Sequence, residues 1–303
     1  MKKINITQLG TLDLNLPLIE LGEGNPKILI INNLHGNEIT GFYVLQRLVR
    51  ILPKEIKCKI TIISSANPLA LLQKNRYTFI DPTDLNRNYP PLEKERGINV
   101  TIKEKLINLG LKHDIIMDIH NFIRPSLSTG VLIKQTNSKK DDLAYKYLAT
   151  LNTDIIIKMD SDNNEEKRVN GSLTSYLASK GKIALGIEYP PINYVNNSTI
   201  EEYAGNFKNL LLLIPSIKND KGNYKRIPIF KRQQIINQKT GLFIPVKKLN
   251  GDVKKGDTLG YIIDVNNLNK NKIVSTYTGK LIEIADNNFF LYGDKIATIG
   301  KKI

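Results

Sequence analysis

ILIINNLHGNE, at residues 28–38, carries the chain from a buried strand into a turn. The residues at 28–31 are isoleucine or leucine, a run typical of a strand that is covered on both faces. After the turn, the apolar residues at 41–52 have helical spacing and are followed by Pro53, which predicts an amphipathic helix. Strand, turn and helix in this order form the repeating unit of an α/β protein.

The same alternation continues to about residue 202. Strand-like apolar runs recur at 60–63, 115–117 and 183–187, and helical spacing recurs at 100–109, 141–151 and 172–180. We therefore expect an α/β sheet with helices on both faces. Ligands of such sheets collect at the carboxyl ends of the strands, so the residues that follow these runs are candidates for a site.

After about Arg226 the pattern changes to short β segments that are separated by glycine turns. Examples of these turns are Gly251-Asp252, Gly256-Asp257 and Gly293-Asp294. We predict two domains, 1–225 and a smaller all-β domain at 226–303, with their junction at 203–226.

Composition limits the class of protein. The chain has 303 residues, of which 41% are hydrophobic and 24% charged, enough to form a packed core. Cys58 is the only cysteine, so an intrachain disulfide is excluded, and we interpret it as an inert core residue. The start is basic but has no apolar segment behind it, and no apolar run reaches the roughly 18 residues of a membrane span. We expect a soluble cytoplasmic protein with no membrane partner.

Charge suggests a different kind of partner. Lys and Arg number 44 against 29 Asp and Glu, a formal net charge of +15. The basic residues form short, scattered doublets, and no aromatic-basic recognition pattern is present. We predict no specific nucleic-acid partner, only weak nonspecific binding, while the charge helps to attract small anionic substrates. The sequence does not fix the number of subunits, and a homo-oligomer is compatible with it.

The chain has three histidines, and two of them follow predicted strands. His35 precedes Glu38 by three residues in the turn, and His120 ends the run at 115–119. Two histidines and one carboxylate form the ligand set of a catalytic zinc site that keeps a position open for water. The alternative is that both are ordinary loop histidines. His113, at the start of a strand, is assigned no function.

Two further segments contain candidate groups. The polar loop at 76–90 contains Arg76, Asn86 and Arg87, which fit a clamp for a carboxylate, although a solvated connection would have a similar composition. Glu188 ends the buried run at 183–187, where partial desolvation favours a general base. An acid solvated at a strand tip is the alternative.

The order of these motifs carries a resemblance. The chain resembles the succinylglutamate desuccinylase/aspartoacylase family in the order of four motifs. These are His-x-x-Glu, Arg76 with Asp-Leu-Asn-Arg at 84–87, a strand-ending histidine, and Gly-Ile-Glu at 186–188. The resemblance covers essentially the whole chain, including the C-terminal β unit. It implies a mixed sheet flanked by helices, like that of zinc carboxypeptidases, with a smaller C-terminal all-β domain.

The resemblance also implies roles for single residues. His35, Glu38 and His120 match the ligands of one Zn²⁺ ion, and Asp84 matches the carboxylate that orients the first histidine. Arg76 matches the group that polarises the scissile carbonyl, and Glu188 matches the catalytic glutamate. The remaining matches are substrate-binding residues, Asn86, Arg87 and, by a loose alignment, Tyr292.

The implied activity is that of a zinc-dependent amidohydrolase, a hydrolase of carbon–nitrogen bonds other than peptide bonds. It would deacylate a small N-acyl amino acid or related carboxylate. A metallocarboxypeptidase acting on a peptide C-terminus is the alternative. One departure concerns specificity, because aspartoacylase has a further arginine shortly before its catalytic glutamate. Residues 174–185 contain no arginine, and Arg168 is farther away. A third reading is a carrier domain with a cofactor on Lys280, which no signature around that residue supports.

Overall fold

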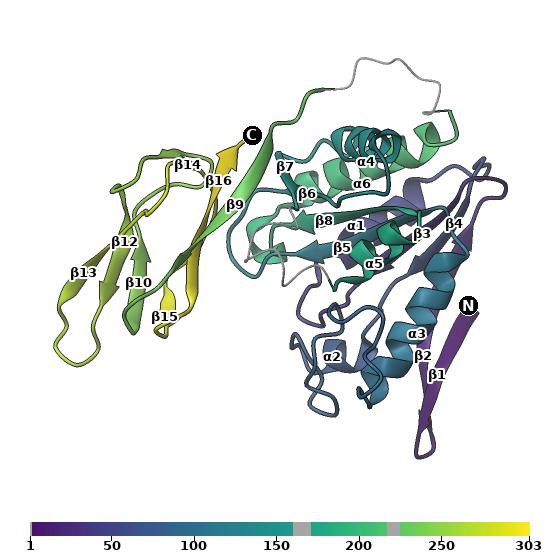
Figure 1. Cartoon of the computed structure of the whole chain (residues 1–303), viewed down its shortest axis with the longest axis horizontal. Coiled ribbons are helices and arrows are strands. Elements are labelled where there is room, and N and C mark those ends of the chain that lie inside the picture. Colours follow the sequence, from purple (N-terminus) through teal and green to yellow (C-terminus); the bar gives the residue numbers. More distant parts are fainter. Residues whose placement is uncertain (1, 160–170, 217–224) are drawn as a thin grey trace.

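The computed structural model describes residues 2–159, 171–216 and 225–303. Its main feature is one long mixed sheet, which runs across Figure 1 from the N-terminal hairpin into the C-terminal strands. The twelve strands of this sheet are, in spatial order, β1 (Lys2–Leu9), β2 (Leu12–Leu21), β4 (Lys59–Ile63), β3 (Lys27–Asn32), β5 (Ile115–Asn121), β8 (Ile183–Tyr189), β6 (Thr129–Leu132), β7 (Ile155–Lys158), β9 (Ile229–Ile236), β16 (Lys295–Lys302), β14 (Gly279–Ile284) and β11 (Asp252–Val253).

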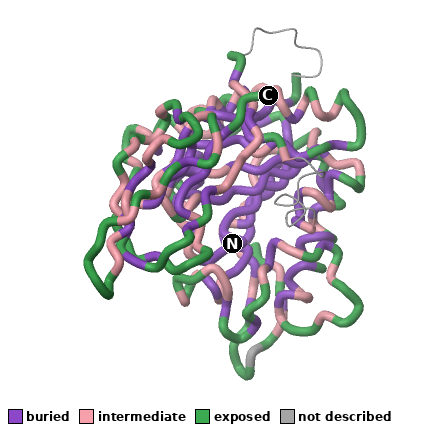
Figure 2. Tube along the Cα trace, turned by 60° about the vertical axis from the view of Figure 1, so that its left-hand side comes forward, coloured by how far each residue is buried: buried purple, intermediate pink, exposed green. Residues whose placement is uncertain are grey.

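The centre of the sheet is parallel, as the apolar runs predict. Strands β4, β3, β5 and β8 are neighbours that run in the same direction, and every residue of β5 is buried. Figure 2 shows this buried interior as a continuous band of purple. All four predicted strands are confirmed. The apolar runs identified them because parallel strands covered on both faces need apolar residues at successive positions.

Helices cover both faces of the sheet (Figure 1). One face packs against α1 (Thr40–Ile51), α4 (Ser138–Thr150) and α6 (Asn197–Leu213). The other face packs against α3 (Ile98–Leu111) and α5 (Leu173–Ser179). Two short elements complete the helical segments, α2 (Pro68–Leu72) and the 3-10 turn η1 (Ile192–Tyr194). The four predicted helices are confirmed to within three residues at each end.

Two parts of the chain differ from the expectation. Strands β1 and β2 form an antiparallel hairpin at the sheet edge, which was not predicted although apolar residues alternate along β2. The predicted junction at 203–226 is wrong in its first half, because α6 occupies it. Asn196 caps this helix by accepting a hydrogen bond from the Thr199 amide at 2.8 Å, and its buried face packs against α1. The polar run at 218–224 lies outside the described residues.

The C-terminal unit is all-β, as expected. Its second sheet is antiparallel and contains β13 (Lys270–Val274), β12 (Thr258–Ile263), β10 (Gly241–Pro245) and β15 (Asn288–Phe290). This sheet packs over β9, β14 and β16 around a small core that includes Phe243 and Ile299. The boundary at residue 225 itself stays a prediction.

The C-terminal unit is joined firmly to the rest of the chain. Strand β9 pairs in parallel with β7, so the main sheet passes directly into this unit. The loop after β5 is also tied to β14, because the Leu127 amide donates to the Ile282 carbonyl at 2.9 Å and the Ile284 amide to the Pro125 carbonyl at 3.1 Å. Leu127 and Ile282 belong to one shared apolar cluster with Phe230. The unit is therefore a fixed wall beside the parallel strands.

No helix among the described residues is both long enough and apolar enough to span a membrane.

Candidate active site

A cavity of about 400 Å³ lies beside the carboxyl ends of β3, β5 and β8, where the fold class predicts a site. The turn after β3, the loop at 76–90 and the start of α5 line one part of it. The C-terminal strands line another part. All the predicted metal-binding, catalytic and substrate-binding residues except Tyr292 line this cavity, while Asp84 lies behind His35.

Two residues, Asn33 and Gly36, shape the turn after β3. Asn33 takes a left-handed conformation (φ 63°), and its side-chain amide donates to the carbonyls of His35 and Glu38 at 2.8 and 3.1 Å. Gly36 passes so close to α2 that a Cβ atom there would lie 2.0 Å from the carbonyl carbon of Ala70. The turn therefore brings His35 and Glu38 to the same centre.

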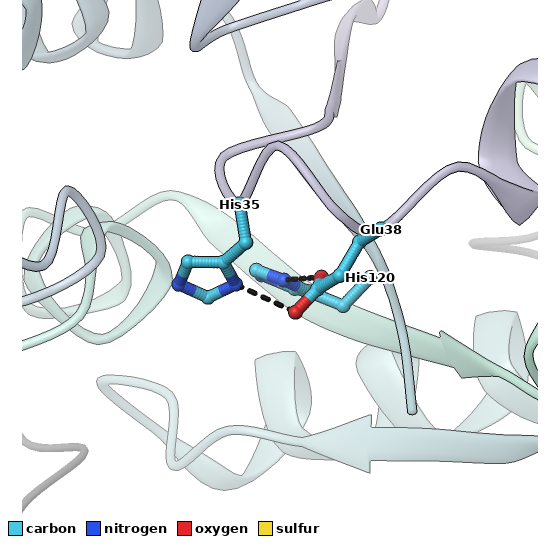
Figure 3. A group of neighbouring side chains, drawn as sticks. All are labelled: His35, Glu38 and His120. Atoms are coloured by element: carbon cyan, nitrogen blue, oxygen red, sulfur yellow. Dashed lines mark hydrogen bonds and ion pairs between the residues drawn. The ribbon is translucent and has the colours of Figure 1, made fainter. Parts of the chain in front are cut away.

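His120, from β5, completes this centre. Its Nδ1 lies 2.8 Å from Glu38 Oε2, and His35 Nδ1 lies 2.8 Å from Glu38 Oε1, as Figure 3 shows. All three side chains are buried, and one ligand atom from each falls within 4.8 Å of the others. Two imidazole nitrogens and a carboxylate oxygen at this separation match the donor set of a catalytic zinc site. The prediction that distant parts of the chain bring these three residues together is confirmed.

Each histidine has a second carboxylate on its far nitrogen. His35 Nε2 lies 3.0 Å from Asp84, and His120 Nε2 lies 2.9 Å from Asp118. An Nε2–H group that donates to a carboxylate leaves the Nδ1 lone pair for a metal ion. Asp84 thus has the partner that the resemblance implied. Asp118 was missed, although its spacing of two residues from His120 puts both side chains on one face of β5.

The charges of the cluster favour the ionised form of its histidines and of Asp84. Burial alone would lower the pKa of His35 and of His120, but the neighbouring carboxylates raise both above the ordinary value for histidine. Burial alone would raise the pKa of Asp84, but His35 and the two arginines of the loop hold it well below its ordinary value. Burial would likewise raise the pKa of Glu38, but the two histidines hold it below its ordinary value, so Glu38 and Asp84 stay ionised and suit a cation.

The two arginines of the 76–90 loop that line the cavity differ in the protein groups that they contact. Arg76 Nη2 donates to Asp84 at 2.9 Å, and its Nη1 lies 3.6 Å from Glu38. Arg87 Nη1 donates to the Asn86 carbonyl at 2.7 Å and is 4.0 Å from Asp84. The Asn86 side chain accepts a hydrogen bond from the Leu173 amide and lies 3.2 Å from His120 Nε2. Arg76 therefore lies nearest the metal cluster, and Arg87 retains donors that no carboxylate binds.

Glu188 lies at the end of β8, directly beside His120 of β5 in the strand register. Burial raises its pKa above the ordinary value for glutamate, and Glu38 raises it further, while His120 and Arg232 act in the opposite direction. A carboxylate with a raised pKa next to a metal cluster is suited to accept and return a proton.

Tyr292 is not part of this arrangement. It lies in the turn between β15 and β16, is 73% exposed and does not line the cavity. The C-terminal unit instead contributes Arg232, Gln234, Glu283 and Lys295. Sequence reasoning missed these four residues. The only available signal was that Arg232 and Gln234 alternate along β9 with residues facing the other side.

His113, Cys58 and Lys280 do not line the cavity, in agreement with the absence of a function assigned to the first two. His113 is a core histidine that lies 3.0 Å from the Thr61 hydroxyl, and Cys58 is buried. The Lys280 amine donates to the Asn250 carbonyl at 3.0 Å and pairs with Asp252, so it does not project from a hairpin tip as a carrier lysine would.

The model of the succinylglutamate desuccinylase/aspartoacylase catalytic domain matches residues 24–214, which span the metal cluster, the arginine loop and Glu188. The chain belongs to this family. It is a family with hydrolase activity, and this member has the deacylase fold with a His-Glu-His cluster suited to one metal ion. No curated protein matches the chain.

Solved structures of low identity share the fold of this family member over nearly its whole length. A succinylglutamate desuccinylase/aspartoacylase from Rhodobacter sphaeroides is 17% identical, with a TM-score of 0.80 over 96% of this chain and 90% of its own. An aspartoacylase family protein from Mesorhizobium loti is 21% identical, with a TM-score of 0.76 and coverage of 96% and 90%. The product-bound ectoine utilization protein EutE (DoeB) from Ruegeria pomeroyi is 16% identical, with a TM-score of 0.82 and coverage of 98% and 93%.

Arg168, the arginine nearest to the family's position before the catalytic glutamate, lies outside the described residues. The start of α5 brings only the hydroxyl side chains of Ser172 and Thr174 to the cavity.

Proposed function

We propose that this family member is a zinc-dependent amidohydrolase that deacylates a small N-acyl amino acid or a related carboxylate. The observation that carries the proposal is the approach of two histidine Nδ1 atoms to the two oxygens of Glu38, with Glu188 on the strand next to His120. His35, Glu38 and His120 would hold the ion. Zn²⁺ bound by such a set supplies a Lewis acid and lowers the pKa of a bound water to about 7.

The residues around this centre have separate tasks. Glu188 takes the proton of the attacking water and then delivers it to the nitrogen of the leaving amine as the carbon–nitrogen bond breaks. Arg76 donates to the carbonyl oxygen as negative charge develops there, a kind of contact that contributes roughly 3–4 kcal/mol. Arg87, with Asn86 positioning it through its carbonyl, binds a free carboxylate of the substrate.

The shape of the cavity favours a small substrate over a peptide. Its volume of about 400 Å³ lies in the range of small-molecule sites. The C-terminal strands form a fixed wall on one side, through the β7–β9 pairing and the backbone hydrogen bonds at 125–127. A metallocarboxypeptidase needs an open groove for the peptide chain, so the wall counts against that alternative.

The first test is the metal content of the purified protein, followed by hydrolysis assays with N-acetyl, N-succinyl and N-formyl amino acids. We expect one ion per chain and release of a free amine from at least one acyl series. His35→Ala should lose the ion, while His113→Ala, which removes the one histidine outside the cluster, should retain it. A wild-type protein that binds no divalent metal, or a His35→Ala variant with full occupancy, would contradict the proposal.

A further inference from the structure

The cavity is lined by positively charged side chains from both the catalytic part and the C-terminal part of the chain. From the catalytic part these are Arg76, Arg87 and Arg124, and from the C-terminal strands they are Arg232 and Lys295. Which of them can bind a substrate depends on which are already paired with a protein carboxylate.

Glu283 pairs with the cations around it. Its carboxylate is 1% exposed, accepts a hydrogen bond from Lys295 at 2.6 Å and lies 3.8 Å from Arg124. The Thr298 hydroxyl also donates to it at 2.7 Å. This buried acid therefore neutralises Lys295 and part of the charge of Arg124.

Arg232 is in a different situation. Among the residues that the structure describes, no carboxylate pairs with its guanidinium and no acceptor receives a hydrogen bond from it. The residue opposite Arg232 on β16 is Gly300, so this neighbouring strand offers no side chain at that position. An arginine that lines a cavity and lacks a protein partner retains donors arranged to bind a carboxylate in a bidentate way.

Arg76 donates to Asp84. Arg124 lies 3.8 Å from Glu283 and over the Phe290 ring. This leaves two cavity arginines that no carboxylate of the described residues approaches closer than 4.0 Å, one on each part of the chain. Arg87 belongs to the catalytic part and Arg232 to the C-terminal wall. Both act electrostatically within the cavity, since Arg232 contributes to the pKa values of Arg87 and of Glu188. Among the described residues, a substrate with a single carboxylate would leave one of these guanidinium groups without a carboxylate at hydrogen-bonding distance.

We propose that Arg232 is a specificity-determining residue that binds a second carboxylate of the substrate, in addition to the one held by Arg87. This inference rests on the proposed deacylase function. The second carboxylate belongs either to the acyl group or to the side chain of the amino acid, and the shared requirement is a carboxylate that faces the wall formed by β9.

The experiment compares substrate pairs that differ by one charge. N-succinyl-alanine against N-butyryl-alanine tests a carboxylate on the acyl group, and N-acetyl-aspartate against N-acetyl-asparagine tests one on the amine side. The variants are Arg232→Gln, Arg232→Lys and, as a matched control, Arg226→Gln, which removes an exposed arginine outside the cavity.

In one of the two pairs, the wild-type protein should prefer the charged member, and Arg232→Gln should reduce that preference roughly 10- to 100-fold, the size expected for a charge-assisted contact. The loss should appear in KM, with kcat/KM of the uncharged member nearly unchanged. Arg232→Lys should restore part of the preference, and Arg226→Gln should keep all of it. An unchanged preference in Arg232→Gln, or an equal loss for both members, would overturn the inference.

Binding measurements separate this inference from the reaction itself. If no compound is hydrolysed, the proposed function fails, but calorimetry with succinate and with the same four compounds still tests Arg232. Carboxylate binding that weakens in Arg232→Gln and persists in Arg226→Gln supports the inference. Binding that is absent from the wild type, or equal in both variants, rejects it. Arg232→Gln should unfold at the wild-type temperature, since the side chain has no described protein partner to lose.

Discussion

His120 and Glu188 are direct neighbours across two parallel strands, because the register of β5 and β8 pairs these two residues. A shift of one residue in either strand would turn one of the side chains to the opposite face of the sheet. Hydrogen bonds of the sheet therefore fix the separation between a metal ligand and the proposed general base. This arrangement allows the two roles to be tested separately.

Glu188→Gln should abolish most turnover and leave the metal in place. Loss of a general acid and base costs about 10²- to 10⁴-fold in kcat, while the amide has nearly the shape of the carboxylate. Metal content and kcat, measured on the same preparation, check this. Glu202→Gln, an exposed change on α6, should retain both. Near-normal turnover by Glu188→Gln would remove this residue from the mechanism.

Asp118→Asn should weaken metal binding without removing a ligand. The carboxylate lies 2.9 Å from His120 Nε2 and is buried, so the asparagine loses the charge that fixes this imidazole. Outer carboxylates of this kind contribute about 10- to 100-fold to metal affinity. Competition with a chelator measures the change, and Asp142→Asn on the exposed side of α4 is the control. Equal affinities in the two variants would show that Asp118 does not orient His120.

Gly36→Ala should destabilise the protein, because the new Cβ would overlap the backbone at Ala70. Overpacking of this kind costs about 1–3 kcal/mol, and here it would also displace His35. Gly205→Ala, in α6 with open space around it, should instead stabilise by about 0.5–1 kcal/mol. Denaturant unfolding of both variants compares the free energies. A harmless Gly36→Ala would mean that the turn after β3 has room to move.

Glu283→Gln should lower the stability by about 1.5–3 kcal/mol at neutral pH, the size of a hydrogen bond to a charged group. Burial alone would raise the pKa of Glu283, but Lys295, Thr298 and Arg124 hold it below its ordinary value of 4.5. Because the folded pKa is depressed, this stabilisation is present above about pH 4.5 and is lost as the pH falls through the folded value.

The difference in Tm between wild type and Glu283→Gln should therefore shrink on acidification below pH 4.5. Asp252→Asn, which changes a carboxylate 93% exposed on β11, should follow the wild-type curve at every pH. A constant difference across the pH range would show that the charge of Glu283 is not what stabilises the wall.

The sequence predicts local features well and long-range contacts poorly. The parallel strands are identifiable because burial on both faces requires unbroken apolar runs, and the metal ligands follow two of those runs. Asp118 was missed because its spacing from His120 puts both side chains on one face of β5 but does not show by itself that the two groups meet. Arg232 and Glu283 reach the cavity only through strand pairings between distant segments, which neither composition nor periodicity specifies. The β1–β2 hairpin was missed because it has no unbroken apolar run. Leu14, Leu16 and Leu18 instead alternate along β2 with Asp13, Asn15 and Pro17, the pattern of a strand with one buried face.

The family resemblance added what local patterns leave open, such as the pairing of Asp84 with His35. It was least useful for Tyr292, where the alignment was loose and the structure puts the side chain in solvent. The wall residues that do line the cavity lie on β9, β14 and β16, and their identity depends on how those strands twist and pair.

Because β9 pairs in parallel with β7, it has two separate structural roles. Besides carrying Arg232, β9 covers a strand edge whose side chains Ile155 and Ile157 are buried against Phe230. A protein truncated at residue 225 would leave that edge without a hydrogen-bonding neighbour and its isoleucines in water, the combination that promotes aggregation. The backbone of β9 is therefore needed to cover this edge, while its cavity-facing side chains, such as Arg232, can be changed without uncovering it.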